Sequence, residues 1–347
     1  MYNYINEKGG VTTMITKEEY LLNPCGTLSI PYWKNKTIII PSNIAIIHKK
    51  NFKNQFDKHQ RFFRLLHLLE SIDIPKIKVD TINLNTDKIA LINMINTCYK
   101  NLNISVNEKD ILEWFNHPTY NNKLWIKIEE NGIMIASGIA EYDEVLNEGI
   151  LEWIQVLPEY QNKGYGKTIV NSLLIELKNL GAKFATVSGN LDNNTNPEKL
   201  YRRCGFTGDD IWYICTADLN FKLKDLQPSQ LYISEEKLSK IKEWFNPDDF
   251  SNFEPIPIKI INAVPVIIDG HTRCVCAILS GLEEIPLEFE KEEWDWDMYG
   301  ACINECKAQN ITSSYDLISR IISKEDYEIK WNKWCDEMQE KIISSRK

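Results

Sequence analysis

Hydrophobic positions in the middle of the chain change repeatedly between a period of two residues and a helical period. In chain order the pattern predicts a strand at 77–84, helices at 86–101 and 107–115, and strands at 124–129, 133–142 and 149–156. A helix at 167–180, a strand at 184–188, a helix at 197–206 and a closing strand that extends to 219 follow. Asn131 and Gly132 separate two apolar runs, which is a strong hairpin signal. This order predicts an α+β (mixed α/β) fold, with one mixed sheet and helices on both of its faces.

The residues before this region show weaker patterns. They predict an unpatterned extension over 1–13, a turn at 23–26, short strands at 37–40 and 43–48, and a helix over 56–71. His59 and His67 would lie two turns apart on that helix, but without a third ligand nearby we predict no metal site.

The residues after this region predict a second, smaller fold. A Gln-Pro-Ser run at 227–229 is interpreted as a linker, and strand, strand, turn, helix, closing strand and further helices follow it. The predicted regions are therefore 1–76, an N-terminal extension and accessory region; 77–225, the central domain; and 229–347, a C-terminal domain that ends in a helical bundle.

Composition narrows the class of protein. A hydrophobic content of 43% with 10 Trp in 347 residues is enough for two or three folded cores. The net charge of −9 argues against a protein that coats nucleic acid or an anionic membrane. Because no run looks able to span a bilayer and the start does not resemble a signal peptide, we expect a soluble, cytoplasmic protein. Nine cysteines without a repeated zinc-ribbon spacing predict reduced thiols, those at 274, 276, 302 and 306 being buried.

Residues 161–166, with the sequence QNKGYG, lie between a predicted strand and a predicted helix. Gly164 and Gly166 have no side chain, so the backbone can turn sharply and approach a ligand closely. The first N–H groups of the following helix would point at that ligand, and the positive end of the helix dipole favours an anion. The stretch therefore predicts a phosphate site.

This region contains two motifs. The pattern Q/R-x-x-G-x-G/A is met by Gln161, Gly164 and Gly166, and a later asparagine followed by L-Y-x-x-x-G-F is met by Asn194, Leu200, Tyr201, Gly205 and Phe206. With these motifs the region resembles the GNAT superfamily of acetyl-coenzyme A-dependent N-acetyltransferases. The resemblance covers about residues 77–219. It implies a splayed sheet in which the strands near Val156 and near Thr186 and Val187 separate. It also implies that acetyl-coenzyme A is bound by Ile154, Val156, Gln161, Lys163, Gly164, Tyr165, Gly166, Lys167 and Asn194.

The resemblance also implies catalytic residues. Tyr201 is the candidate acid that protonates the departing thiolate, although it could instead be a tyrosine packed beneath the strand end. Glu152 is the candidate base that deprotonates the amine, and Glu148 is the alternative. Alternation along the strand predicts that Glu152 shares a face with Ile150 and Ile154, opposite Trp153.

The C-terminal region resembles the ParB/sulfiredoxin-like fold over about residues 231–289. Members of this fold share a P-I-x-V strand, a D-G-H-x-R or related turn at a helix start and an I-P-led strand, and the corresponding segments here are 254–259, 264–273 and 281–286. It implies a phosphate or nucleotide site at Asp269, Gly270, His271, Thr272 and Arg273; the other interpretation is a capping Asp followed by surface residues. The sulfinic acid reductases of this group carry a Cys between the Gly and the His, whereas His271 follows Gly270 directly.

The resulting hypothesis is a cytoplasmic N-acetyltransferase that moves an acetyl group directly to a primary amine of a small molecule or a protein. Its C-terminal domain would bind a nucleotide or a phosphorylated ligand. Two alternatives stay open: a protein that senses acyl-coenzyme A and nucleotide without transfer, and a nucleotide-dependent, kinase-like activity in the C-terminal domain. No membrane partner is expected, nucleic acid is disfavoured, and the oligomeric state stays open.

Overall fold

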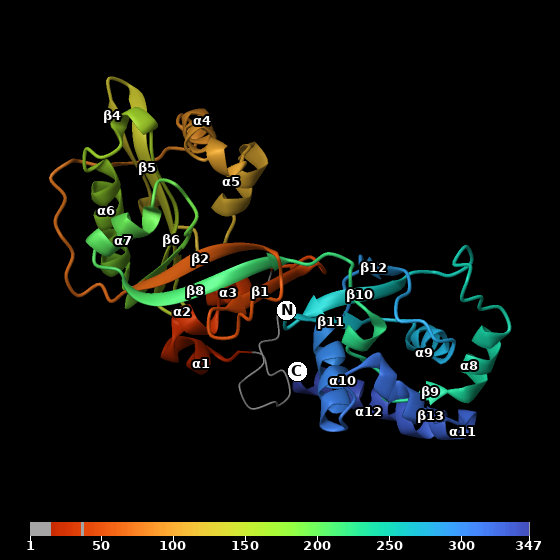
Figure 1. Ribbon diagram of the computed structural model, residues 1–347. Helices are drawn as coiled ribbons and strands as arrows, with labels where there is room; N and C mark the ends of the chain where they lie inside the picture. Colours follow the sequence, from red (N-terminus) through yellow and green to blue (C-terminus); the bar gives the residue numbers. More distant parts are fainter. Residues whose placement is uncertain (1–14, 36–37, 347) are drawn as a thin grey trace.

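The computed structural model describes residues 15–35 and 38–346, and the first of its two parts surrounds an eight-stranded sheet (Figure 1). The strand order is β1-β8-β2-β7-β6-β5-β4-β3. The strands are β1 Ile44–His48, β2 Lys58–His67, β3 Asp80–Thr81, β4 Trp125–Glu130, β5 Ile133–Asp143, β6 Glu148–Val156, β7 Phe184–Asn190 and β8 Thr207–Thr216. The helices are α1 Lys17–Leu22, α2 Pro24–Thr27, α3 Tyr32–Asn35, α4 Lys88–Cys98, α5 Glu108–Phe115, α6 Tyr165–Leu180 and α7 Pro197–Arg203.

Helices cover both faces of the sheet, as the sequence predicts (Figure 1). On one face α6 buries Ile169, Val170 and Leu173 against β5, β6 and β7, and Tyr201 of α7 joins the same core. On the other face α4 and α5 bury a second cluster, which includes Leu91 and Ile111. The sheet is therefore the wall between two apolar cores, although a few polar side chains, such as Arg64, Ser137 and Glu148, are also buried on its central strands.

Local sequence signals explain the elements that were predicted correctly. Asn107 caps α5 with both halves of a capping box, and Gly181 ends α6 with a left-handed backbone (φ 104°). Asn131 and Gly132 have φ of 53° and 76°, the geometry that a tight hairpin turn requires. The helices and strands predicted between 86 and 206 are confirmed to within a few residues.

The N-terminal elements correct several predictions. Residues 58–67 form strand β2 between β7 and β8, so the helix predicted over 56–71 is wrong. Phe63 and Leu65 bury in the α6 core while Arg64 points to the other face, which is the two-residue period of a strand. His59 and His67 therefore lie on a strand.

Other N-terminal predictions also change. The turn at 23–26 is the short helix α2, capped by Asn23, and the strand at 77–84 shortens to β3. The strand predicted at 37–40 begins outside the described residues and its remainder is not strand, whereas the one at 43–48 is β1. The extension over 1–13 lies outside the described residues. Because β1 and β2 join the main sheet, residues 44–67 are part of that sheet; the three domain boundaries remain a prediction.

The C-terminal part has its own small sheet, in the order β11-β10-β12. Its elements are β9 Ile233–Ser234, α8 Glu235–Lys242, β10 Ile256–Ile261, β11 Val264–Ile267, α9 His271–Leu279, β12 Leu287–Phe289, α10 Trp296–Ala308, β13 Ile321–Ile322, α11 Lys324–Tyr327 and α12 Lys333–Ser345. The predicted order of strand, strand, turn, helix and strand is confirmed. The cysteines at 274, 276, 302 and 306 are buried, as expected.

The predicted linker at 227–229 is wrong. Gln227 and Ser229 are buried, and the Gln227 backbone pairs beside β11, donating to the Pro265 carbonyl at 2.8 Å. The amide of Gln227 also donates to the carbonyl of Ile311. The Pro in this stretch suggests a loop, but the buried glutamine is fully integrated in the C-terminal core.

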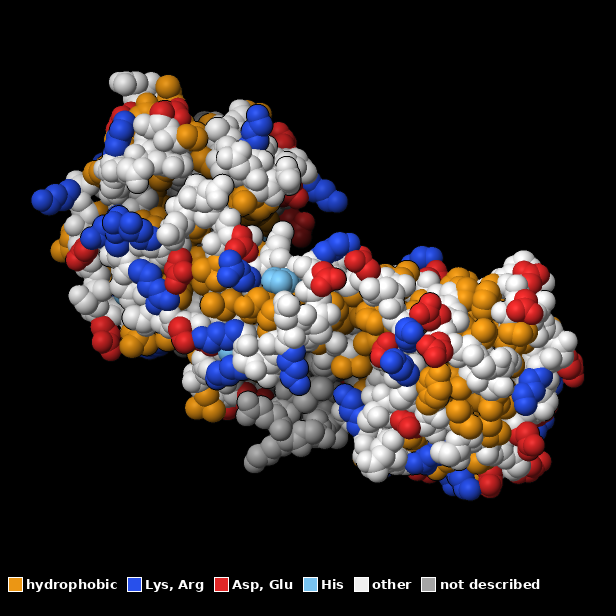
Figure 2. All heavy atoms as spheres, viewed as in Figure 1, with side chains coloured by type: hydrophobic (Ala, Val, Ile, Leu, Met, Phe, Trp, Pro, Cys, Tyr) orange, Lys and Arg blue, Asp and Glu red, His pale blue; other side chains and the backbone are white. Residues whose placement is uncertain are grey.

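The two parts of the chain are packed together. Ala45 and Ile47 of β1 share an apolar cluster with Ile260 of β10, and the Ile260 N–H donates to the Ser42 carbonyl at 2.8 Å. Lys259 donates from its ammonium to the same short segment, at 3.1 Å from the Ile40 carbonyl. Acidic and basic side chains are interspersed on the face shown in Figure 2. In the described ranges, no helix is both long and apolar enough to cross a membrane.

Candidate active site

The main sheet opens between β6 and β7. These two parallel strands pair only over Glu148 to Leu151 with Phe184 to Val187, and from Glu152 onward β6 pairs with β5 alone. The separation that the GNAT resemblance implied is therefore present. Thr186 and Val187 are the last β7 residues that pair with β6, whereas β7 continues to pair with β2 as far as Asn190. An opened strand edge offers backbone donors and acceptors to an extended ligand.

A β-bulge lies where the sheet opens. Trp153 pairs with Ile139 while Leu151 pairs with Ala140, so Glu152 is the extra residue on β6. The bulge puts the side chains of Glu152 and Trp153 in one pocket, whereas Ile154 packs against the α6 core. The predicted alternation is thus wrong beyond Ile150, because it assumed an unbroken strand.

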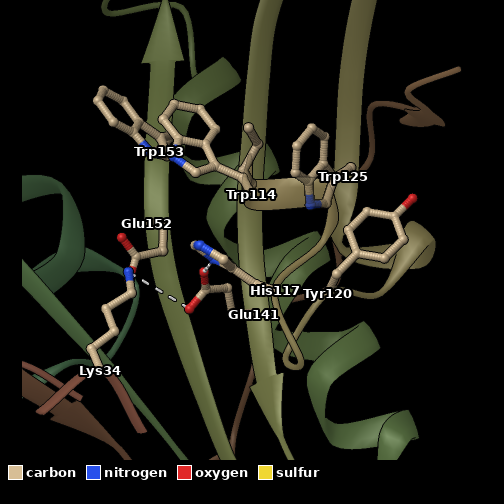
Figure 3. A pocket seen from close by; sticks show the side chains of 9 residues that line it. Lys34, Trp114, His117, Tyr120, Trp125, Glu141, Glu152 and Trp153 are labelled. Atoms are coloured by element: carbon tan, nitrogen blue, oxygen red, sulfur yellow. Dashed lines mark hydrogen bonds and ion pairs between the residues drawn. The ribbon is translucent and has the colours of Figure 1, made fainter. Parts of the chain in front are cut away.

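The pocket at the bulge has a volume of about 180 Å³. Its lining comes from α3, from α5 and the turn after it, and from β4, β5 and β6: Lys34, Trp114, His117, Tyr120, Trp125, Ile139, Glu141, Glu152 and Trp153. Figure 3 shows the carboxylates of Glu141 and Glu152 turned toward Lys34, with the indoles of Trp114 and Trp153 beside them. The pocket therefore combines acidic groups with aromatic walls.

Charges inside the pocket are closely paired. The Lys34 ammonium lies 2.6 Å from Glu152 and 3.7 Å from Glu141, and the Nδ1–H of His117 donates to Glu141 at 3.0 Å. Burial and then the nearby Glu152 charge raise the pKa of Glu141. Burial alone would lower the pKa of Lys34, but the carboxylates of Glu152 and Glu141 outweigh it and raise that pKa. The two carboxylates of the pocket therefore already surround one ammonium group, that of Lys34.

Stacked rings form the rest of the pocket. Trp114 and Trp153 stack with their centroids 4.8 Å apart, and Tyr120 meets Trp125 edge to face at 5.5 Å. The faces of such rings attract cations, most strongly where water is excluded. An amine with an apolar or aromatic body would therefore match both walls.

Glu148, the alternative base, lies away from this pocket. It is fully buried, accepts hydrogen bonds from Tyr20 at 2.8 Å and Thr186 at 2.6 Å, and lies 3.5 Å from the guanidinium of Arg64. A carboxylate held this way has a structural role. The geometry therefore favours Glu152 over Glu148 as the candidate base.

Tyr201, the candidate acid, lies on α7 in the α6 core. Its ring contacts Phe63 and Phe206, and no described residue is hydrogen-bonded to its hydroxyl. Burial, and after it the nearby Tyr99, raises the pKa of Tyr201 well above its usual value. The hydroxyl therefore keeps its proton at neutral pH and can serve as a donor.

The glycine turn has the backbone of an anion cradle. Gly164 is the N-cap of α6 with φ 94°, and an added Cβ there would meet nothing within 4 Å. Asn162 also has a positive φ, of 61°. The N–H groups of Tyr165, Gly166 and Lys167 precede the first intrahelical bond, which Thr168 donates to Gly164.

The side chains of the turn contact nearby residues. The ammonium of Lys163 lies over the Tyr160 ring, Lys167 pairs with the exposed Asp73 at 2.7 Å, and Tyr165 donates to Glu130. The Gln161 amide donates to the Val156 carbonyl at 3.2 Å. An exposed ion pair such as Lys167 with Asp73 is weak, so the lysine is readily recruited by a phosphate.

The opened edge of β6 is partly covered by α4. The Tyr99 hydroxyl donates to the Ile154 carbonyl at 3.2 Å, and the Cys98 thiol contacts the Val156 carbonyl at 3.5 Å. A carbonyl oxygen has two lone pairs, so a pantetheine amide could still bond to Ile154, whereas the Val156 carbonyl already has both Cys98 and Gln161 as partners. Asn194 lies exposed in the loop before α7, and the cap of that helix is Asn196.

The Asp269–Arg273 motif lies at the start of α9. Gly270 is the N-cap with φ 85°, and Thr272 is in the first turn. The Arg273 guanidinium bonds the Glu254 carbonyl at 2.6 Å and lies 3.5 Å from Asp269. This cation is therefore already engaged by acceptors, which weakens the phosphate interpretation of its side chain.

His271 is buried beneath the turn. Its Nε2 accepts the Ser229 N–H at 3.0 Å, and burial, opposed by Asp269, lowers its pKa to about 4. Asp269 and His271 line a second cavity of about 350 Å³, together with Ser229, Gln230, Ile268, Trp294, Asp295, Met298, Tyr299, Cys302, Trp331, Cys335, Met338 and Gln339.

Acidification is expected to destabilise the C-terminal part through His271. Its pKa is about 4 when folded and about 6.5 when unfolded, so the unfolded state takes up the proton first as pH falls. Stability should be full above pH 6.5 and decline by about 3 kcal/mol toward pH 4. Urea unfolding at pH 7.5 and 4.5 measures this loss, and the variant His271→Gln should show a smaller one. An equal loss in the variant would contradict the assignment.

Several pocket residues were missed by sequence reasoning. Lys34, His117 and Glu141 come from separate segments and share no motif, so only the fold brings them to Glu152. Tyr99 was likewise missed, although it bonds the opened strand.

Comparisons with known proteins find acetyltransferases that are similar to the central part of the chain. A family model described as "Acetyltransferase (GNAT) family" matches residues 89–206. The chain is 29% identical over 128 residues to the ribosomal protein bS18-alanine N-acetyltransferase of Haemophilus influenzae, covering 35% of this chain and 85% of that protein.

Solved structures show weaker overall similarity. The GCN5-related N-acetyltransferase from Sphaerobacter thermophilus has a TM-score of 0.41 and 12% identity, with 50% of this chain and 59% of that chain covered. The ribosomal-protein-S18-alanine N-acetyltransferase from Escherichia coli has a TM-score of 0.33 and 21% identity, with 42% and 97% covered.

The family match and the opened sheet define an acetyltransferase domain. Residues 89–206 match the GNAT family and form an N-acetyltransferase domain, and proteins of this family use acetyl-coenzyme A as co-substrate. The residues before 89 and after 206, including the C-terminal part, lie outside the match.

Proposed function

We propose that the protein transfers an acetyl group from acetyl-coenzyme A directly to a primary amine held in the pocket at the β6 bulge. The observation that carries this proposal is the position of Glu152, which lines a pocket of carboxylates and aromatic rings at the residue where β6 leaves β7. The donor would approach along the opened strand edge, and the acceptor would occupy the space between the carboxylates and the tryptophans.

The residues on this path have complementary chemistry. Glu152 would accept a proton from the ammonium, since a lysine-like amine has a pKa near 10.4 and is charged at neutral pH. A β6 N–H near Val156 would polarise the thioester carbonyl. Tyr201 would protonate the thiolate as it leaves. The N–H groups of Tyr165, Gly166 and Lys167 would hold the diphosphate, with Lys163 and Gln161 beside them.

Turnover of acetyl-coenzyme A with a panel of amines tests this proposal. The panel should include a lysine side chain, an aromatic monoamine and a peptide that begins with alanine, the last because of the Haemophilus relative. Thiol release that depends on an amine supports transfer. Binding of acetyl-coenzyme A without release in any arm would favour the alternative of a non-catalytic sensor.

The glycine turn gives a graded prediction. An added Cβ at Gly166 would lie 3.2 Å from Leu200 and 3.7 Å from Val156, so alanine fits with a small shift but valine crowds the N–H cradle. We expect Gly166→Val to raise KM for acetyl-coenzyme A by about 10- to 100-fold, the loss of one or two bonds to a charged group. Gly166→Ala should have a much smaller effect. Steady-state kinetics at a saturating amine measures both variants, and equal effects would contradict the cradle.

We propose separately that the C-terminal cavity binds a small molecule with an aromatic group. Trp294, Trp331 and Tyr299 supply rings, while Lys and Arg are absent from the described residues that line it. The strand and helix order around α9 supports the ParB/sulfiredoxin-like resemblance and hence a nucleotide as ligand. Because Asp269 lines the cavity and Asp295 is already paired with Arg346, we expect the base to provide most of the affinity.

Thermal unfolding in the presence of ligands tests this second proposal. A nucleoside should raise the midpoint as much as its triphosphate does, because the base binds in the cavity. A shift with ATP or CTP but with neither nucleoside would instead favour the phosphate site at residues 269–273. If ATP or CTP is also hydrolysed, the kinase-like alternative gains support; no shift with any of them would contradict nucleotide binding.

A further inference from the structure

The chain places one of its own amines in the proposed acceptor position. Lys34, on the short helix α3, reaches from the N-terminal elements into the pocket, and its ammonium lies 2.6 Å from Glu152 (Figure 3). The side chain of Lys34 is 23% exposed. A lysine side chain is a primary amine, which is the class of acceptor that we propose for this pocket.

The ammonium of Lys34 lies close to the point where the sheet opens. Glu152 is the bulge residue that directly follows the last β6–β7 pair, Leu151 with Val187. The Lys34 nitrogen therefore lies at the start of the opened strand edge, beside the residue that we assign as the base. It meets Glu141 as well, at 3.7 Å, so both carboxylates of the pocket surround it.

We infer that Lys34 is a site of self-acetylation, an inference that rests on the proposed function of the same pocket. Glu152 takes a proton from the ammonium, and the nitrogen lone pair attacks the thioester carbonyl carbon of acetyl-coenzyme A. The N–C bond forms and the C–S bond breaks, with its electron pair leaving on sulfur. Two protons leave the nitrogen overall; one ends on the thiol sulfur, through Tyr201, and one is released to solvent.

The product changes the pocket. An acetylated Lys34 is neutral and can no longer form an ion pair with Glu152 or Glu141, so both carboxylates lose their cation. The acetyl group also remains inside a cavity of only about 180 Å³. Self-acetylation would thus alter both the charge and the free space that an incoming amine meets.

Enzymatic labelling of Lys34 can be distinguished from chemical acetylation by its selectivity. Chemical acetylation favours exposed lysines such as Lys58, whose side chain is 65% exposed and pairs only at the surface with Asp218. Lys34 is largely buried and its charged form is stabilised by two carboxylates, so it should react slowly with a reagent in solution. Faster labelling of Lys34 than of Lys58 therefore requires assistance by the site.

The test is incubation of the full chain with isotopically labelled acetyl-coenzyme A and no added amine, followed by peptide mass spectrometry over time. We expect up to one label per chain at Lys34, at a rate independent of protein concentration and at least ten times that of Lys58. The variant Glu152→Gln should lose the Lys34 label and keep the Lys58 background, and Lys34→Arg should show that background alone.

Turnover with the amine panel, measured in parallel, separates this inference from the proposed function. Turnover of free amines with no excess label on Lys34 overturns the inference and leaves the proposed function intact. Equal labelling of Lys34 and Lys58, or equal labelling in Glu152→Gln, also overturns it. If neither free amines nor Lys34 are acetylated, both the inference and the proposed function fail.

Discussion

Replacing Glu152 by Gln is expected to lower kcat/KM for acetyl transfer to a lysine-like amine by about 10²- to 10⁴-fold, the usual contribution of a general base. The amide keeps the size of the side chain but cannot take the proton of the ammonium. The loss of kcat/KM should be smaller for amines of lower pKa, because these are partly neutral at neutral pH and depend less on a base. Steady-state kinetics with amines of graded pKa measures both effects.

A matched control separates chemistry from folding. Glu144→Gln makes the same change at an exposed position in the turn between β5 and β6 and should leave kcat/KM unchanged. Thermal unfolding of both variants shows whether the fold is retained. A folded Glu152→Gln protein whose deficit is small, or is the same for all amines, would remove Glu152 from the role of base.

Replacing Glu148 by Leu is expected to destabilise the sheet-containing part by about 3–5 kcal/mol, the cost of leaving a buried charge without its partner. The side chains of Arg64 and Glu148 are 2% and 0% exposed, and Tyr20 bonds to both of them. The Arg64 Nε already lacks a partner among the described residues. Removing the carboxylate would leave the guanidinium dependent on hydroxyl groups alone.

The double variant Arg64→Leu with Glu148→Leu provides the control. Because it removes both charges, it should cost clearly less than the sum of the two single substitutions. Urea unfolding of the full chain, followed by fluorescence, measures the three free energies of unfolding. A single-variant cost below about 1 kcal/mol, or strict additivity, would show that the pair contributes little.

The parts of the fold that sequence predicted well are those with local signals. The cap at Asn107, the Asn131-Gly132 turn and the apolar face of α6 each depend on a few neighbouring residues, so their elements were found near their true ends. Strand β2 was missed because its apolar residues, including Phe62, Phe63, Leu65 and Leu66, are close enough in sequence to suit a helix too. Its two-residue period is decided by pairing with β7 and β8.

The candidate site likewise has residues that belong to local motifs and residues that only the fold brings together. The glycine turn and Tyr201 were found because they belong to compact motifs. The bulge at Glu152 depends on the register with β5, and the meeting of Lys34, His117 and Glu141 depends on the fold of three distant segments. Sequence therefore predicted the residues of the proposed donor side, while most of the proposed acceptor pocket emerged only from the structure.

A crystal structure of the full chain with a non-reactive thioether analogue of acetyl-coenzyme A tests the central claim most directly. We predict that the diphosphate contacts the N–H groups of residues 165–167, that the pantetheine runs along the opened edge of β6, and that the acyl end points toward Glu152. An analogue bound elsewhere, or an acyl end directed away from the pocket of Glu141 and Glu152, would contradict this account of how the protein works.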